Sequence, residues 1–165
     1  MPLSSLTGIR QQLLQTIRSL SHKDLNRRPS DAEWSVAQIA EHLHLVERAV
    51  ASQIRHGLFE ISETPFVERP IETVLDRSVR VKVPNPALEP KNEPISSDEL
   101  TEKLTRSREQ LLEAIKGFTP EDLRRRAFSH PLFGMLSLQQ WITFLEYHER
   151  RHLEQISETM KKLGI

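Results

Sequence analysis

His130–Ile156, HPLFGMLSLQQWITFLEYHERRHLEQI, is the stretch of sequence that decides the fold. Ser137 and Gln140 have the spacing of a capping-box pair, which predicts that a helix begins there. Such a helix packs an apolar stripe against its neighbours. Apolar residues recur here at three- and four-residue steps and form that stripe: Leu138, Trp141, Ile142, Leu145, Ile156, Met160 and Leu163.

Two histidines, His148 and His152, lie four residues apart and point into the same stripe. A buried polar group without a partner costs about 1–3 kcal/mol. A metal ion would use a nitrogen of each ring, and this is a spacing at which two histidines of one helix bind one ion. The pair therefore predicts a metal site whose third ligand comes from elsewhere in the chain. Ordinary hydrogen-bonded core histidines are the alternative.

Length and composition limit the class of protein. The 165 residues are the size of a single domain, residues 1–165. Lys plus Arg equals Asp plus Glu at 23 each, so no net charge attracts nucleic acid or an anionic membrane. We find no membrane-length apolar run and no signal-peptide pattern, and we expect a cytoplasmic protein. The absence of cysteine leaves histidine and carboxylate as the metal ligands.

Apolar periodicity predicts three further long helices, over roughly residues 4–20, 35–58 and 96–117. A single helical turn is expected to begin at Ser21. Together with the helix that follows residue 137, these elements predict an all-α four-helix bundle, a fold that builds sites from side chains on facing helices. The similar stretches SHKDLNRR and TPEDLRRR fit two packed helical hairpins.

A long proline-rich connection separates the second and third long helices. We expect a short helix over residues 71–80 and no central strand near the later prolines. A connection of this length covers a site or links helices across a bundle. Residues 61–96 hold six of the ten prolines: Pro65, Pro70, Pro84, Pro86, Pro90 and Pro94.

The second long helix offers two candidates for the third ligand. His42 and His44 flank its buried face on opposite sides, and periodicity does not say which of them turns inward. Glu47, near that face, is a candidate to accept the second N–H of a metal-bound histidine.

The chain resembles the DinB-like superfamily, metal-binding four-helix bundles that include bacillithiol S-transferases. Two segments carry the resemblance: EWSVAQIAEHL, Glu33–Leu43, and the stretch from His130 to Ile156 quoted above. The resemblance implies that His42 joins His148 and His152 around a divalent metal ion, usually zinc or nickel, with open positions for water or substrate. It also implies a homodimer. His44 does not match the ligand position, and we expect it on the helix surface beside Glu41.

His148-Glu149-Arg150-Arg151-His152 also satisfies the H-E-x-x-H pattern of zinc metalloproteases, in which the Glu is the general base. No histidine follows His152, and no edge strand is evident to hold a peptide, so we do not expect a protease. Glu149 stays a candidate catalytic group, acting on metal-bound water or supporting a ligand. A surface ion pair with Arg or Lys is the alternative.

The remaining histidines and one basic run have ordinary interpretations. His22, His56 and His130 fall in a turn, at a helix end and in a loop, and His130 is also a candidate for the mouth of a pocket. The run Arg124–Arg126 is typical of a solvated patch. Its functional alternative is an anion clamp at the pocket rim for a carboxylate-bearing thiol.

The expected function is that of a metal-dependent thiol S-transferase. The metal would lower the pKa of a low-molecular-weight thiol, and the thiolate would attack a small electrophile. A metal-dependent hydrolase and a non-catalytic metal- or ligand-binding module are the alternatives. The expected partner is a small-molecule substrate, with neither nucleic acid nor membrane.

Overall fold

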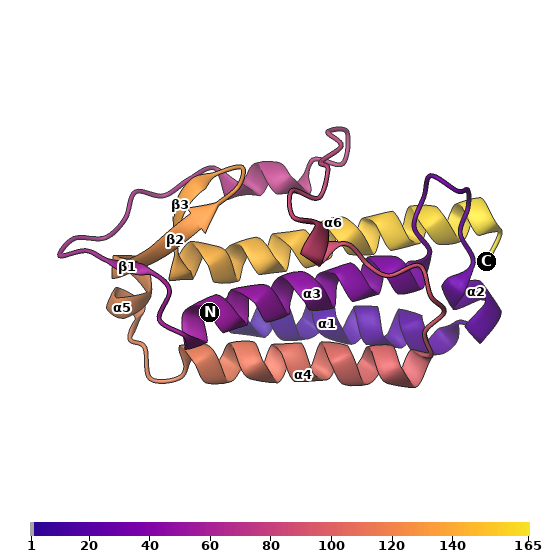
Figure 1. The fold of residues 1–165 in the computed structure, drawn as a ribbon, viewed down its shortest axis with the longest axis horizontal. Helices are drawn as coiled ribbons and strands as arrows, with labels where there is room; N and C mark the ends of the chain where they lie inside the picture. Colours follow the sequence, from indigo (N-terminus) through magenta and orange to yellow (C-terminus); the bar gives the residue numbers. More distant parts are fainter. Residues whose placement is uncertain (1) are drawn as a thin grey trace.

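The computed structural model describes residues 2–165, and long helices dominate it (Figure 1). The predicted four-helix bundle is confirmed, and each long helix begins and ends within a few residues of its expected bounds. A short helix extends the bundle at either end: α2 (His22–Asn26), which begins after Ser21 as predicted, and α5 (Pro120–Arg125). The long helices are α1 (Pro2–Ser19), α3 (Val36–Arg55), α4 (Ser97–Ile115) and α6 (Leu138–Leu163).

Hydroxyl side chains cap the helices that carry the site. At α3 the Ser35 hydroxyl accepts from Gln38 N–H and the Gln38 side chain accepts from Ser35 N–H, a complete capping box. At α6 Ser137 is the cap as predicted, but the box is half formed. The Gln140 side chain instead pairs with both backbone groups of Arg69, its Oε1 3.0 Å from the nitrogen and its Nε2 2.9 Å from the oxygen. Gln140 thus ties the long connection to the start of α6.

A small antiparallel sheet accompanies the all-α bundle. β1 (Glu60–Ile61), β2 (Arg126–His130) and β3 (Gly134–Ser137) pair in that order. The segment expected to be a loop is therefore a hairpin, and His130 ends a strand. Gly134, with φ of 73°, supplies the backbone conformation that the turn needs. Stacking against α6 supplies the packing, because Phe128 lies 4.4 Å from Trp141 between ring centroids.

The long connection passes over α3 and α6 (Figure 1). The helix expected over residues 71–80 is only a short 3-10 helix, η1 (Ile71–Leu75), because the Asp76 side chain accepts from Ser78 N–H and turns the chain away. A second short turn, η2 (Pro86–Leu88), follows. The guanidinium of Arg151 on α6 donates to three carbonyls of this connection, those of residues 74, 76 and 79. The connection is therefore fastened to the bundle.

The core consists of two apolar clusters, one toward each end of the bundle. Val46, Val50 and Trp141 belong to one cluster, and Ile39 and Ile156 belong to the other. Along α6, His148 lies between the two clusters, and His42 lies on α3 next to Leu43 at the edge of the second cluster. No helix within residues 2–165 carries an apolar stretch long enough to cross a membrane.

Candidate metal centre

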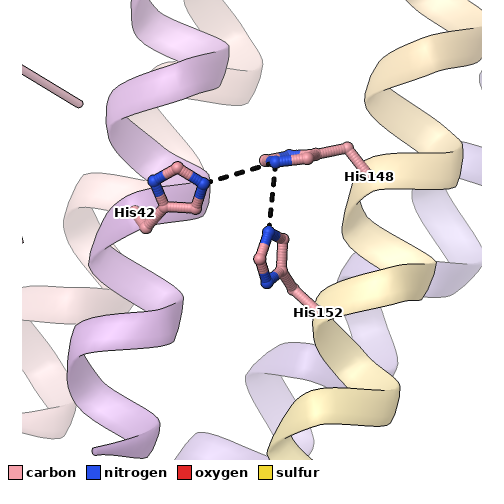
Figure 2. Close-up of side chains that lie close together, drawn as sticks. All are labelled: His42, His148 and His152. Carbon is pink, nitrogen blue, oxygen red and sulfur yellow. Dashed lines mark hydrogen bonds between the residues drawn. The ribbon is translucent and has the colours of Figure 1, made fainter. Parts of the chain in front are cut away.

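Three histidines from two helices converge at the middle of the bundle (Figure 2). Nε2 of His148 lies 3.3 Å from Nε2 of His42 and 3.1 Å from Nε2 of His152. His42 is 5% exposed and His152 is 8% exposed. Among residues 2–165 this is the group of histidine and carboxylate side chains that is arranged to hold a metal ion. The predicted pair and the third histidine implied by the resemblance are thus brought together.

The outer nitrogens of two of these rings fix which atoms carry protons. His42 Nδ1 lies 2.8 Å from the Leu88 carbonyl oxygen, and His152 Nδ1 lies 2.7 Å from Gln155 Oε1. An oxygen acceptor requires a donor, so each Nδ1 carries the proton and each Nε2 turns a lone pair inward. One proton at most, on His148 Nε2, can then be shared between the two neighbouring nitrogens. Such a set of inward lone pairs fits a bound cation better than hydrogen bonding alone.

The spacing and protonation of the three rings also fit a metal. Two nitrogens that bind one tetrahedral zinc ion at about 2.0–2.1 Å lie about 3.3–3.4 Å apart. The separations of 3.3 and 3.1 Å from His148 Nε2 are close to this value. Burial lowers the pKa of His42, lowers that of His148 well below its usual range and lowers that of His152 to about 3. All three rings are therefore neutral at pH 7, as metal ligands must be.

His44 does not lie where we expected it. Its Nδ1 lies 2.9 Å from the Lys103 carbonyl oxygen on α4, and the residue is only 6% exposed. The surface expectation is wrong because α3 packs against α4 as well as α6, which buries both flanks of the helix. His22 and His56 are exposed, and His56 bonds to Ser52 within its own helix, in keeping with ordinary roles.

A cavity of about 690 Å³ opens over the three imidazoles and extends along α3 and α6 in both directions. Phe144 stacks on the His148 ring at 5.3 Å, and Trp34 packs against the His42 ring at 5.2 Å. We call the Phe144 end the aromatic arm; it is lined by Val46, Val50, Phe128, His130, Trp141 and Phe144. We call the Trp34 end the charged arm; it is lined by Glu33, Trp34, Arg80, Lys82, Glu158 and Lys162.

The run Arg124–Arg126 does not line this cavity. Arg125 pairs with Glu121 at 2.9 Å and Arg126 pairs with Asp122 at 2.6 Å. The anion clamp, which was the alternative to a solvated patch, is therefore wrong for these residues, because each of these two guanidiniums is paired one turn away within its own segment. The cations of the cavity come instead from the long connection and from α6.

Glu149 and Glu47 belong to a buried ring of four charges rather than to the histidines. Arg10 Nε donates to Glu149 Oε1 at 2.8 Å, and Arg108 Nη2 donates to Glu149 Oε2 at 2.9 Å. Glu47 accepts from Arg108 Nε at 2.8 Å and from Arg10 Nη2 at 3.2 Å. Glu47 is thus not the acceptor of a ligand N–H, and Glu149 pairs with arginine in the core rather than at the surface. Both oxygens of Glu149 are engaged by guanidinium groups, which leaves it poorly suited to act as a base.

The sequence contains a signal for this charge ring. Arg10 falls between Leu6 and Leu13, and Arg108 falls between Leu104 and Leu111, so each lies within the apolar stripe of its helix. Burial lowers the pKa of Arg10, but Glu47 and Glu149 outweigh this and raise it, so its charge is secure.

Known proteins resemble this chain over almost its whole length. Residues 5–156 match the profile of the DinB superfamily. The uncharacterized protein YuaE of Bacillus subtilis (strain 168) is 32% identical over 161 residues, which cover 98% of each chain. The crystal structure of TT2238, described as a four-helix bundle protein, has a TM-score of 0.66 with 24% sequence identity. The match spans 95% of this chain and 96% of that one, and it shows the same fold.

Proposed function

The chain belongs to the DinB superfamily, and from this premise we propose that it is a metal-dependent enzyme of the thiol S-transferase type. The observation that carries the proposal is the convergence of three inward-facing Nε2 atoms beneath a large cavity. His42, His148 and His152 would hold the ion, and imidazole ligands suit zinc and nickel. A bound divalent ion supplies a Lewis acid that lowers the pKa of a thiol.

The surrounding groups hold the three imidazoles ready for this task. The Leu88 carbonyl and the Gln155 side chain accept the outer N–H groups, which orients the rings and raises their basicity as ligands. Trp34 packs against the His42 ring and Phe144 packs against the His148 ring, which limits how far these rings can turn. The chain's own contribution is thus to keep the ligands neutral and fixed.

The carboxylates near the site favour a thiol over water as the nucleophile. A free thiol has a pKa of about 8.5, far below that of water, so it needs less help to lose its proton. Attack by water commonly relies on a positioned general base. Of the three carboxylates that line the cavity, Glu33 and Glu158 pair with Lys162 and Arg77, and Glu89 is exposed on the long connection. Within residues 2–165 no hydrogen bond joins a carboxylate to an imidazole of the cluster, which also argues against the protease-like motif.

Elemental analysis of protein purified without added metal tests the site. We expect about one zinc or nickel ion per chain, lost in His42→Ala and kept in His44→Ala. His44 is a matched control, because it is a buried histidine of the same helix that bonds to a carbonyl on α4. Absence of metal from the wild-type protein, even after zinc is added back, would overturn the proposal.

A rate measurement separates an enzyme from a binding module. The wild-type protein is assayed with cysteine, glutathione and bacillithiol against a chromogenic electrophile, beside His148→Ala. We expect thiol conjugation that depends on the metal and is lost in the variant. A metal-loaded protein that is no faster than His148→Ala with any of these thiols would instead be a non-catalytic metal-binding module.

A further inference from the structure

His130 is a buried histidine that the metal centre does not use. It ends β2, is 8% exposed and lines the aromatic arm. Its ring lies 4.5 Å from Phe144, 5.0 Å from Trp141 and 4.9 Å from Phe133 between centroids. From the sequence we expected His130 in a loop, with the mouth of a pocket as a candidate position. The structure encloses it among three aromatic rings inside the cavity.

One backbone contact fixes the proton on this ring. Leu132 N–H donates to His130 Nδ1 at 3.0 Å, so Nδ1 is unprotonated and Nε2 carries the proton. Burial lowers the pKa of His130 to about 4, which keeps the ring neutral at pH 7. Within residues 2–165 no group accepts the Nε2–H. This N–H is not among the fully buried side-chain atoms that lack a partner, so it is accessible from the cavity, where a ligand or water can accept its hydrogen bond.

The two arms of the cavity differ in the ligands they can take. α3 and α6 run in opposite directions, so Val46, Val50, Trp141 and Phe144 lie at one end and Glu33 and Lys162 lie at the other (Figure 1). The imidazole cluster lies between the arms and contacts an aromatic ring on either side. A charged thiol is better solvated in the charged arm, whereas the aromatic arm excludes charged groups and offers one neutral N–H donor.

We propose that the aromatic arm is a binding subsite for a second substrate, a flat apolar molecule that bears a carbonyl oxygen, and that His130 Nε2–H donates to this oxygen. The inference rests on the proposed function for the chemistry at the imidazoles, since it places a second substrate beside the same cluster. Binding itself does not require the metal. His130 acts in this scheme as a binding residue that selects for an acceptor on the ligand.

The test compares acetophenone with ethylbenzene, which has a methylene group in place of the carbonyl. Each probe is titrated into full-length protein, with and without chelator, while the two tryptophan indole N–H signals are followed by NMR. Trp34→Phe assigns the signals. The tryptophans report separately on the arms, because Trp141 lines the aromatic arm and Trp34 lies in the charged arm.

We expect acetophenone to bind the wild-type protein about fivefold more tightly than ethylbenzene, the worth of one ordinary hydrogen bond, and to shift the Trp141 signal. His130→Phe should abolish this preference and still bind ethylbenzene. His130→Gln, which keeps an N–H donor, should retain most of it. Equal binding of the two probes to the wild-type protein, a preference that survives His130→Phe, or a shift confined to Trp34 would each overturn the proposal. If His130→Phe does not fold, the wild-type ratio and the signal that shifts decide the matter.

The two proposals fail separately in these experiments. If the protein prefers acetophenone but never contains metal, the subsite proposal stands and the transferase proposal fails. If the protein contains metal but binds both probes equally, the metal-centre proposal stands and the subsite proposal fails.

Discussion

Replacing Glu149 with glutamine should destabilise the fold without affecting the metal centre. The charge ring balances Arg10 and Arg108 against Glu47 and Glu149, with side chains that are 3–11% exposed. Glu149→Gln keeps the volume of the side chain but leaves two guanidinium groups facing one carboxylate. Breaking a buried pair in this way costs about 3–5 kcal/mol. The glutamine oxygen can still accept one hydrogen bond, so we expect a loss of about 3 kcal/mol.

Urea unfolding followed by circular dichroism measures this loss, with chelator present so that metal does not contribute to the free energy of unfolding. Glu102→Gln is the surface control. Its partner Arg106 is 64% exposed at the side chain, and exposed pairs contribute about 0–1 kcal/mol. Metal content of Glu149→Gln, measured without chelator, should equal that of the wild type because neither oxygen of Glu149 contacts an imidazole.

A loss below about 1 kcal/mol for Glu149→Gln would show that the charge ring does not hold the fold in the way argued. A loss of metal would show that the three imidazoles depend on Glu149, either directly or through the alignment of α3 and α6. A charge-balanced double variant gives a further check. Arg10→Met with Glu149→Leu removes one cation and one anion, so Glu47 and Arg108 remain as a matched pair. The double variant should therefore lose much less stability than the sum of the single variants.

Further predictions concern metal, pH, the long connection and association. His148→Ala should lower the melting temperature of metal-loaded protein to that of the chelated wild type, and an unchanged melting temperature would contradict the metal site. Chelated protein should lose stability as pH falls from about 6.5 toward 4. Burial lowers the pKa of His130 to about 4 and that of His152 to about 3 in the folded chain. These histidines therefore take up protons in the unfolded chain over this range but not in the folded chain, which favours unfolding. Metal-loaded protein should fall more steeply between about pH 7 and 5, as scanning calorimetry would show, since protons also displace the ion. Arg151→Gln should speed amide hydrogen exchange across residues 74–79, whose carbonyls it binds, whereas Arg150→Gln should not. Light scattering should give a homodimer mass, and a monomer at tens of micromolar would refute it.

Much of the fold and half of the site follow from local sequence patterns. Periodicity and N-cap residues predicted the four long helices, because both signals act within a few residues. The pair His148 and His152 was also visible, since both lie on one helix. Helical periodicity could not decide between His42 and His44. That choice depends on distant partners, because the His42 ring bonds to the Leu88 carbonyl in the connection and the His44 ring bonds to the Lys103 carbonyl on α4.

Features that depend on distant partners escaped the sequence. The hairpin that ends at Ser137 is stabilised by the stacking of Phe128 on α6. Its two strands are too short for their sequence alone to predict it. The positions of Glu47 and Glu149 near buried faces suggested a role beside the metal. Their actual partners are arginines on α1 and α4, and a search for charged residues within apolar stripes would have found all four members.

The charge ring has a consequence for how the four helices align along their axes. It takes one residue from each of α1, α3, α4 and α6, so no helix can slide by a turn without moving its charge about 5.4 Å from its partners. Apolar stripes alone would tolerate such a slip, because apolar side chains would still pack against apolar side chains of the neighbouring helix after it. We expect the four charges to favour one axial alignment of the helices over alignments shifted by a turn. The three imidazoles depend on that alignment, because the nitrogens of α3 and α6 meet at 3.3 Å only when both helices stand at the same level.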